Sequence, residues 1–167
     1  MAALLIEHDP LLINPLDIAE RIITEREWAF DRPIEDELVA EVSGTWCNFR
    51  IWFTWQPDLG AMMFSCAYDM KIPKCHHATV YPLLTRINER MWLGHFDLCS
   101  EDGGVTFRQS TLLKGGSPLG QGYIEELMDI AITECERFYP AFQAVVWAGQ
   151  KPEDALRFAI FETFGEA

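Results

Sequence analysis

The chain is poor in basic residues. Its 167 residues include 13 Lys and Arg against 26 Asp and Glu, which gives a formal net charge of −13. An acidic chain repels phosphate groups, and no cluster of Lys or Arg interrupts this pattern. The composition therefore argues against nucleic acid and against a membrane as partners, and it fits a solvated acidic surface that keeps the protein soluble.

Recognisable chemical motifs are also missing. The residue spacing contains no catalytic triad, no phosphate-binding loop and no closed metal site. The five cysteines are odd in number and include no Cys-x-x-Cys pair, which disfavours a disulfide framework and a structural zinc site and suits a reducing compartment. We therefore expect a cytoplasmic protein that is not an enzyme and that carries no cofactor.

The chain has no long hydrophobic run. Residues 1–13 contain six leucines and isoleucines, but Glu7, His8, Asp9 and Pro10 interrupt them and no basic segment precedes them. This pattern does not fit a signal peptide or a membrane span. We expect residues 1–13 to form an N-terminal arm that docks on this domain or on a second copy, and residues 14–167 to form a single domain.

Apolar residues are plentiful, at 49% of the chain, and aromatic residues reach 13%, so a packed interior is expected. The apolar spacing changes between helical and strand periods along the chain. It predicts a helix, three antiparallel strands, a helix, two strands and two helices, which is an α+β domain with a five-stranded sheet. The predicted ranges are helix 14–28, strands 35–42, 46–55 and 61–68, helix 77–92, strands 95–99 and 105–113, and a helical last third that ends with a short helix from 152 to about 163.

Local residue types mark several of these boundaries. Asn14 is placed to cap the first helix, with Pro15 in its first turn. Gly94 is expected to end helix 77–92. Residues 115–118 resemble a flexible link. Apolar residues recur at heptad spacing from Ile124 to Val145, and Pro140 within this stretch is expected to bend or break the helix.

Two short segments contain residues that could carry chemistry. Cys75, His76 and His77 are three possible metal ligands that lie together, but neighbouring residues on a helix point about 100° apart. A segment that leads into a helix is therefore the favoured interpretation. His95 and Asp97 should share one face of a strand and could tune a general base, yet no nucleophile accompanies them, which favours a structural hydrogen bond.

Residues 87–97 form a helix end, a glycine and a strand start within a short stretch. Asn88, Gly94, His95 and Asp97 are its polar and glycine positions, and we interpret them as a candidate structural motif. We therefore expect this segment to have a structural role and not a catalytic one.

Two arginines and two tryptophans give a candidate interaction surface. Arg50 and Arg108 are solitary bases within apolar strands, where they could pair with a carboxylate on a neighbouring strand or anchor an acidic segment of a partner. Trp46 and Trp52 should share the face of Arg50. Tryptophan and arginine are enriched at protein interfaces, although burial of the two tryptophans beneath a terminal helix is the competing interpretation.

Six segments, taken in their order and spacing, resemble the YbjN family of bacterial proteins. They are NPLD at residues 14–17, YDMKIP at 68–73, INERMWLGHFD at 87–97, FR at 107–108, CERFYPAFQAVVWAG at 135–149 and the GEA tail at 165–167. Members are described as regulators of sensory transduction. Their fold resembles that of type III secretion chaperones, a twisted antiparallel sheet flanked by helices, and they are often dimeric. The resemblance brings no catalytic residue and no cofactor.

These observations lead to two functional hypotheses. The first is a non-enzymatic, chaperone-like regulator that binds another protein of unknown identity and forms a homodimer. The alternative is a sensor of a small molecule or a metal ion, with His76, His77, His95 and the cysteines as candidate ligands.

Overall fold

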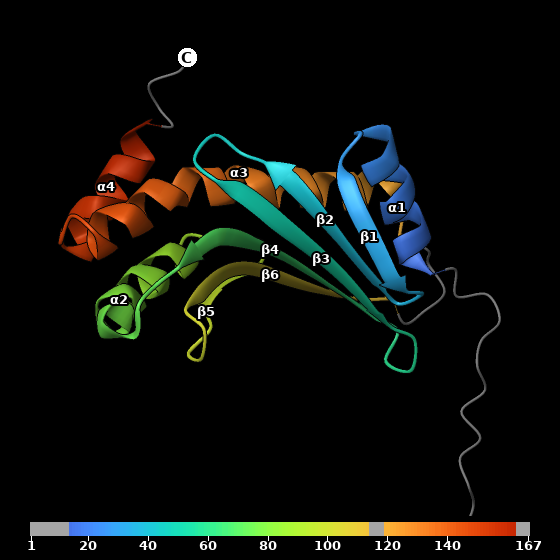
Figure 1. The fold of residues 1–167 in the computed structure, drawn as a ribbon, viewed down its shortest axis with the longest axis horizontal. Helices are drawn as coiled ribbons and strands as arrows, with labels where there is room; N and C mark the ends of the chain where they lie inside the picture. The colour runs from blue at the N-terminus through green and yellow to red at the C-terminus, as the bar shows by residue number, and fades with distance from the viewer. Residues whose placement is uncertain (1–13, 114–118, 163–167) are drawn as a thin grey trace, which may run out of the picture.

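The computed structural model describes residues 14–113 and 119–162 and shows an α+β fold built on one antiparallel sheet (Figure 1). Within these residues, six strands pair in the order β1-β2-β3-β4-β6-β5. The predicted arm, the predicted link and the GEA tail lie outside the described residues. In chain order, the elements are α1 (Pro15–Glu25), β1 (Ala29–Ile34), β2 (Glu37–Ser43), β3 (Asn48–Gln56), β4 (Ala61–Lys71), a 3-10 turn (Lys74–His76), α2 (His77–Asn88), β5 (His95–Leu98), β6 (Gly104–Leu112), α3 (Gln121–Val146) and α4 (Pro152–Glu162).

The start of α1 follows the prediction. Asn14 Oδ1 accepts a hydrogen bond from the backbone N–H of Leu16 at 2.9 Å, and Pro15 occupies the first helical position. Asn14 Nδ2 also donates to the carbonyl of Glu35 at 3.1 Å and to Oδ1 of Asp36 at 3.3 Å. The first described residue is therefore fixed at the β1–β2 turn.

The end of α1 differs from the prediction, because the helix stops at Glu25 and does not reach residue 28. The backbone N–H of Trp28 donates to the carbonyl of Ile23 at 3.1 Å, which is the hydrogen bond of a Schellman motif. Glu27 takes the left-handed conformation of this motif, with φ of 57°. Glycine is the usual residue there, so the sequence carried no stop signal.

The prediction of five strands is wrong, since residues 29–34, which it left between the first helix and the first strand, form a sixth strand, β1. Pro33 concealed this strand, because proline is confined to edge strands and bulges. β1 is an edge strand, and its register against β2 shifts between Asp31 and Ile34. The proline therefore sits at an irregular position of the edge, where its missing N–H does not break the ladder.

The second helix is also shorter than predicted. α2 ends at Asn88, with Glu89 as its C-cap, so the prediction that Gly94 stops this helix is wrong. Gly94 does have a positive φ, 66°, but it lies at the start of β5. The side chain of Asn88 is engaged with β5, as described below, and this contact holds the end of the helix against the next strand.

The long helix α3 covers one face of the sheet, together with α1, while α2 and α4 pack against α3 beyond one end of the sheet (Figure 1). Pro140 does not break α3. The apolar stripe predicted for it is buried, but it faces the sheet and not a second long helix. For example, the hydroxyl of Tyr68 on β4 donates to the carbonyl of Cys135 at 2.9 Å. The buried stripe consists of Ile124, Met128, Ala131, Cys135, Phe138, Phe142 and Val145.

Strand β3, and strand β4 from Met62 onward, alternate between a buried and an accessible side chain. The buried set faces α1 and α3 and forms the core with them. The other set points away from these helices. In the described part of the chain, no helix covers this second face of the sheet, which we call the open face (Figure 1). The alternating buried set on these two strands is Phe49, Ile51, Phe53, Trp55, Met62, Phe64, Cys66, Tyr68 and Met70.

Candidate functional site

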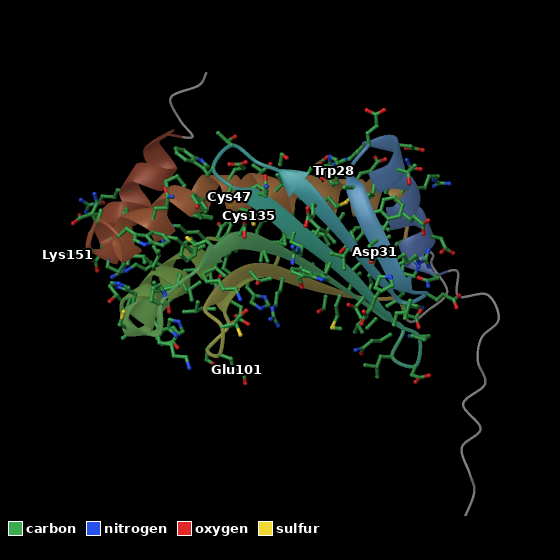
Figure 2. The ribbon with its side chains drawn as sticks, viewed as in Figure 1. Trp28, Asp31, Cys47, Glu101, Cys135 and Lys151 are labelled. Carbon is green, nitrogen blue, oxygen red and sulfur yellow. The ribbon has the colours of Figure 1, made fainter. Side chains whose placement is uncertain are left out.

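The open face is hollowed into a groove of about 630 Å³ that crosses β2, β3, β4 and β6. Figure 2 marks the two margins of the sheet, with Asp31 on β1 and Glu101 in the β5–β6 turn. Trp52 lines one end of the groove, and charged side chains line much of the rest. The charged side chains are Glu41, Arg50, Asp69, Lys71, Asp102 and Arg108.

The strand register places Trp52 near the middle of the open face. Trp52 pairs with Val39 on β2 and with Ser65 on β4, and Ser65 pairs in turn with Arg108 on β6. His95 on β5 completes this row beside Arg108. Neighbouring strands are about 4.8 Å apart, so the backbones of Trp52 and Arg108 are separated by about 10 Å. A tryptophan and an arginine from distant parts of the sequence thus share one row of the sheet.

Each arginine of the open face has a carboxylate partner on a neighbouring strand. Arg50 Nη2 lies 3.1 Å from Oε1 of Glu41, and Arg108 Nε lies 3.7 Å from Oδ2 of Asp97. The guanidinium of Arg50 is also 5.7 Å from the centre of the Trp52 ring, within range of a cation–π contact. About half of each charged side chain is exposed to solvent. Exposed pairs of this kind contribute about 0.2–1 kcal/mol each, so either arginine can exchange its carboxylate partner at low cost.

Trp46 is not part of this groove. The strand predicted to begin at residue 46 begins at Asn48, and Trp46 lies in the β2–β3 loop with 48% of its surface exposed. The structure therefore brings together Arg50, Trp52 and Arg108, three of the four predicted surface residues. Trp52 lies on the open face and not beneath a terminal helix.

Lys71 and Asp102 close one end of the groove, and sequence reasoning missed both. Lys71 Nζ lies 2.9 Å from Oδ2 of Asp102, and the backbone N–H of Gly104 donates to Oδ1 of the same carboxylate at 3.0 Å. The ammonium of Lys71 first, and this amide second, hold the pKa of Asp102 well below its usual range. The turn around Asp102 was visible in the sequence, but its contact with Lys71 depends on the pairing of β4 with β6.

The predicted structural motif holds β5 in place. Asn88 Nδ2 donates to the carbonyl of Phe96 at 3.0 Å, and Asn88 Oδ1 accepts from the backbone N–H of the same residue at 2.8 Å. The end of α2 is thereby joined to β5 by two hydrogen bonds. His95 and Asp97, on either side of Phe96, share the open face as the strand period predicts. The motif therefore positions two of the polar groups at one margin of the site.

Two of the cysteine thiols, those of Cys47 and Cys135, do not have the properties of reactive nucleophiles. Burial raises the pKa of Cys47 and raises that of Cys135 still further. A catalytic thiol needs the opposite shift, since the thiolate is the reactive species. Figure 2 shows both side chains where the β2–β3 loop and α3 meet the sheet.

The histidine segment leads into α2. Cys75 and His76 lie in the 3-10 turn that precedes the helix, and His77 is buried with Nε2 3.0 Å from the carbonyl oxygen of Ile72. Within residues 14–113 and 119–162, no three His, Cys, Asp or Glu side chains lie close enough together to hold a metal ion. No described helix is both long enough and apolar enough to span a bilayer.

Comparison with known proteins places this geometry in a family. A family model, YbjN, described as "Putative bacterial sensory transduction regulator", matches residues 15–144. No curated protein matches the chain. One similar solved structure is described as "Crystal structure of YbjN, a putative transcription regulator from E. coli". It is 10% identical, with a TM-score of 0.53, and the match covers 75% of this chain and 89% of that chain, so it establishes a shared fold. The match over residues 15–144 confirms the family resemblance that the sequence segments carry, and this chain belongs to the YbjN family.

Proposed function

We propose that this protein is a non-enzymatic cytoplasmic regulator that acts by binding another protein through the open face of its sheet. The observation that carries the proposal is the position of Trp52, which lines the same groove as Arg50 and Arg108. Tryptophan and arginine contribute most often to the binding energy of protein interfaces, especially at the centre of a partly desolvated patch.

The charge of the open face supports a particular kind of partner. Arg50, Lys71 and Arg108 are three of only 13 Lys and Arg residues in a chain with a formal charge of −13. They line the same groove as Trp52, whose cross-strand neighbour on β2 is Val39. A partner segment with apolar side chains flanked by carboxylates would match this arrangement, because the exposed arginines can exchange their present partners.

The likeness to type III secretion chaperones and the homodimer remain part of the proposal. Chaperones of this kind bind a segment of another protein without chemical conversion. This mode agrees with a groove lined by side chains suited to contact and with buried thiols whose pKa values are raised.

A binding experiment with two tryptophan variants tests this function. The wild-type chain, Trp52→Ala and Trp147→Ala are used to capture proteins from a lysate of the native cell, and the retained partner is then purified and titrated against each chain. Trp147 is a matched control, since it is 58% exposed and lies at the end of α3, away from the groove. We expect Trp52→Ala to weaken binding about 30-fold or more, as for a hot-spot residue of about 2 kcal/mol, and Trp147→Ala to bind as wild type.

Three results would count against the proposal. The first is that the wild-type chain retains no partner. The second is a partner that binds Trp52→Ala as tightly as wild type. The third is an equal loss in the two variants, which would indicate a general effect of removing a surface tryptophan.

A further inference from the structure

We propose that a pocket between α2 and α4 binds a small organic phosphate through Arg86, Arg90 and Arg157. The pocket has a volume of about 190 Å³ and lies where these two helices pack together, beyond one end of the sheet (Figure 1). It shares no described lining residue with the groove of the open face. The site therefore adds a ligand to the proposed function and does not depend on it.

Positive charge prevails in the lining of this pocket. Three arginines and one glutamate line it, together with two apolar residues, which gives a formal charge of +2 in a chain whose formal charge is −13. Glu89 and Asp154 lie close by in the sequence, but both are exposed and neither is among the described residues that line the pocket. Like charges at short range repel one another, and an anion with two charges would relieve this repulsion. The described lining residues are Arg86, Arg90, Glu153, Leu156, Arg157 and Ile160.

The three arginines have hydrogen-bond donors available for such an anion. Arg90 Nη1 donates to the carbonyl of Arg86 at 2.7 Å, and Arg86 Nη2 is paired with Oε1 of Glu153. Arg157 is exposed and has no hydrogen-bond or ion-pair partner among the described residues. A guanidinium has five N–H donors, and its fork geometry matches two oxygens of a phosphate. Within the described part of the chain, most donors of these three side chains are therefore unused.

Glu153 marks the place where the oxygens of the ligand would bind. It is ion-paired with Arg86 on α2, and it precedes Arg157 by four residues on α4, a spacing that brings the Cβ atoms of two helical residues within about 6 Å. The side chains of Arg86 and Glu153 are 39% and 51% exposed, and ion pairs as exposed as this one are weak. A ligand with more negative charge than a carboxylate can therefore displace Glu153 from Arg86 at low cost.

The size and the apolar wall of the pocket limit what the phosphate can carry. Pockets that hold drug-sized ligands usually have about 300–1,000 Å³, so this one fits a smaller molecule. Leu156 is buried and Ile160 is partly buried, and together they provide an apolar wall beside the arginines. A phosphate monoester with a compact apolar group matches both parts of the pocket. Its phosphate would meet the guanidinium groups, while its apolar group would contact the leucine and the isoleucine.

Isothermal titration of the full-length chain with phenyl phosphate, in a low-salt buffer without other phosphate, tests the proposal. We expect one phenyl phosphate to bind per chain, and Arg157→Gln to weaken this binding about tenfold, because charge-assisted hydrogen bonds are lost. Arg21→Gln is the matched control and should bind as wild type does, since Arg21 is an exposed arginine on α1 whose Nη2 donates to Oε1 of Gln121 at 2.9 Å. Inorganic phosphate should bind about threefold more weakly than phenyl phosphate, or weaker still, because it has no group for the apolar wall.

A Glu153→Gln variant gives a result that a purely structural cluster of charges would not. It removes the carboxylate that competes for Arg86, so phenyl phosphate should bind about threefold more tightly than to wild type. Circular dichroism checks that each variant keeps its fold. Arg157→Gln removes no hydrogen bond or ion pair of the described residues, so it keeps the test decisive if loss of the Glu153 pair disturbs α4.

Four results would overturn the proposal. The first is that phenyl phosphate does not bind at millimolar concentration. The second is an equal loss in Arg157→Gln and Arg21→Gln, which would indicate nonspecific attraction to exposed arginines. The third is a folded Glu153→Gln variant that binds no more tightly than wild type. The fourth is inorganic phosphate that binds as tightly as phenyl phosphate, which would refute the role of the apolar wall.

Discussion

At the scale of single residues, the short strand β5 depends on two positions. Asn88 ties the end of α2 to the backbone of Phe96 with two hydrogen bonds, and Gly94 turns the chain into the strand with a positive φ. Sequence reasoning identified both residues as structural, because a helix end, a glycine and a strand start follow one another closely. It could not show that the asparagine acts through its side chain, since that contact depends on how the turn after the helix folds back.

The first prediction concerns Gly94→Ala. A Cβ at this position would lie 2.3 Å from Cζ of the buried Phe107 and 2.8 Å from the carbonyl oxygen of Arg108, and the backbone conformation disfavours any side chain. We expect the free energy of unfolding to fall by about 3 kcal/mol or more, measured by urea denaturation. Gly149→Ala is the control, because Gly149 has a similar φ of 64° but open space around it. Its expected loss is only about 1 kcal/mol. Equal losses in the two variants would show that crowding at Phe107 is unimportant.

At the scale of elements, the largest departure from the sequence pattern is the edge of the sheet. The apolar periods of β2, β3 and β4 predicted these strands within a few residues, because each strand is long and alternates between buried and accessible side chains over most of its length. β1 contains Pro33, and the helix before it ends without a glycine. Both of these sequence features argued against a strand at residues 29–34. Pairing with β2 outweighs these local preferences.

The second prediction tests how α1 ends. Glu27 occupies a left-handed position with φ of 57°, where a side chain is strained and glycine is not. Glu27→Gly should therefore raise the free energy of unfolding by about 0.5–1 kcal/mol in urea denaturation, after the larger entropy of glycine in the unfolded chain is subtracted. Glu25→Gly, two residues earlier and inside the helix, should instead destabilise by about 1 kcal/mol. A destabilised Glu27→Gly variant would mean that the glutamate side chain contributes more than the strain costs.

At the scale of the whole molecule, charge and packing divide between the two faces of the sheet. The covered face holds the core, while the open face carries both signs of charge around Trp52. The open face could be predicted in part. The solitary arginines and tryptophans in apolar strands indicated a surface, but Trp46 lies in the β2–β3 loop and outside the groove, because β3 begins two residues later than the pattern suggests. Lys71 and Asp102 required the pairing of strands that are distant in the sequence.

The third prediction concerns the homodimer. Light scattering after size exclusion should give a mass twice that of the 19.2 kDa chain. Because each chain carries a formal charge of −13, two copies repel one another, and the dimer fraction should rise as salt screens this repulsion. A monomer at every salt concentration would contradict the homodimer while leaving the open face available to another protein.

The strict alternation of β3 also has an evolutionary consequence. Phe49, Ile51 and Phe53 belong to the core, whereas Arg50 and Trp52, between them in the sequence, belong to the open face. A substitution on the open face leaves the packing beneath it unchanged, so recognition can diverge while the scaffold is retained. Natural selection can thus change the partner of such a protein one codon at a time, without passing through an unstable intermediate.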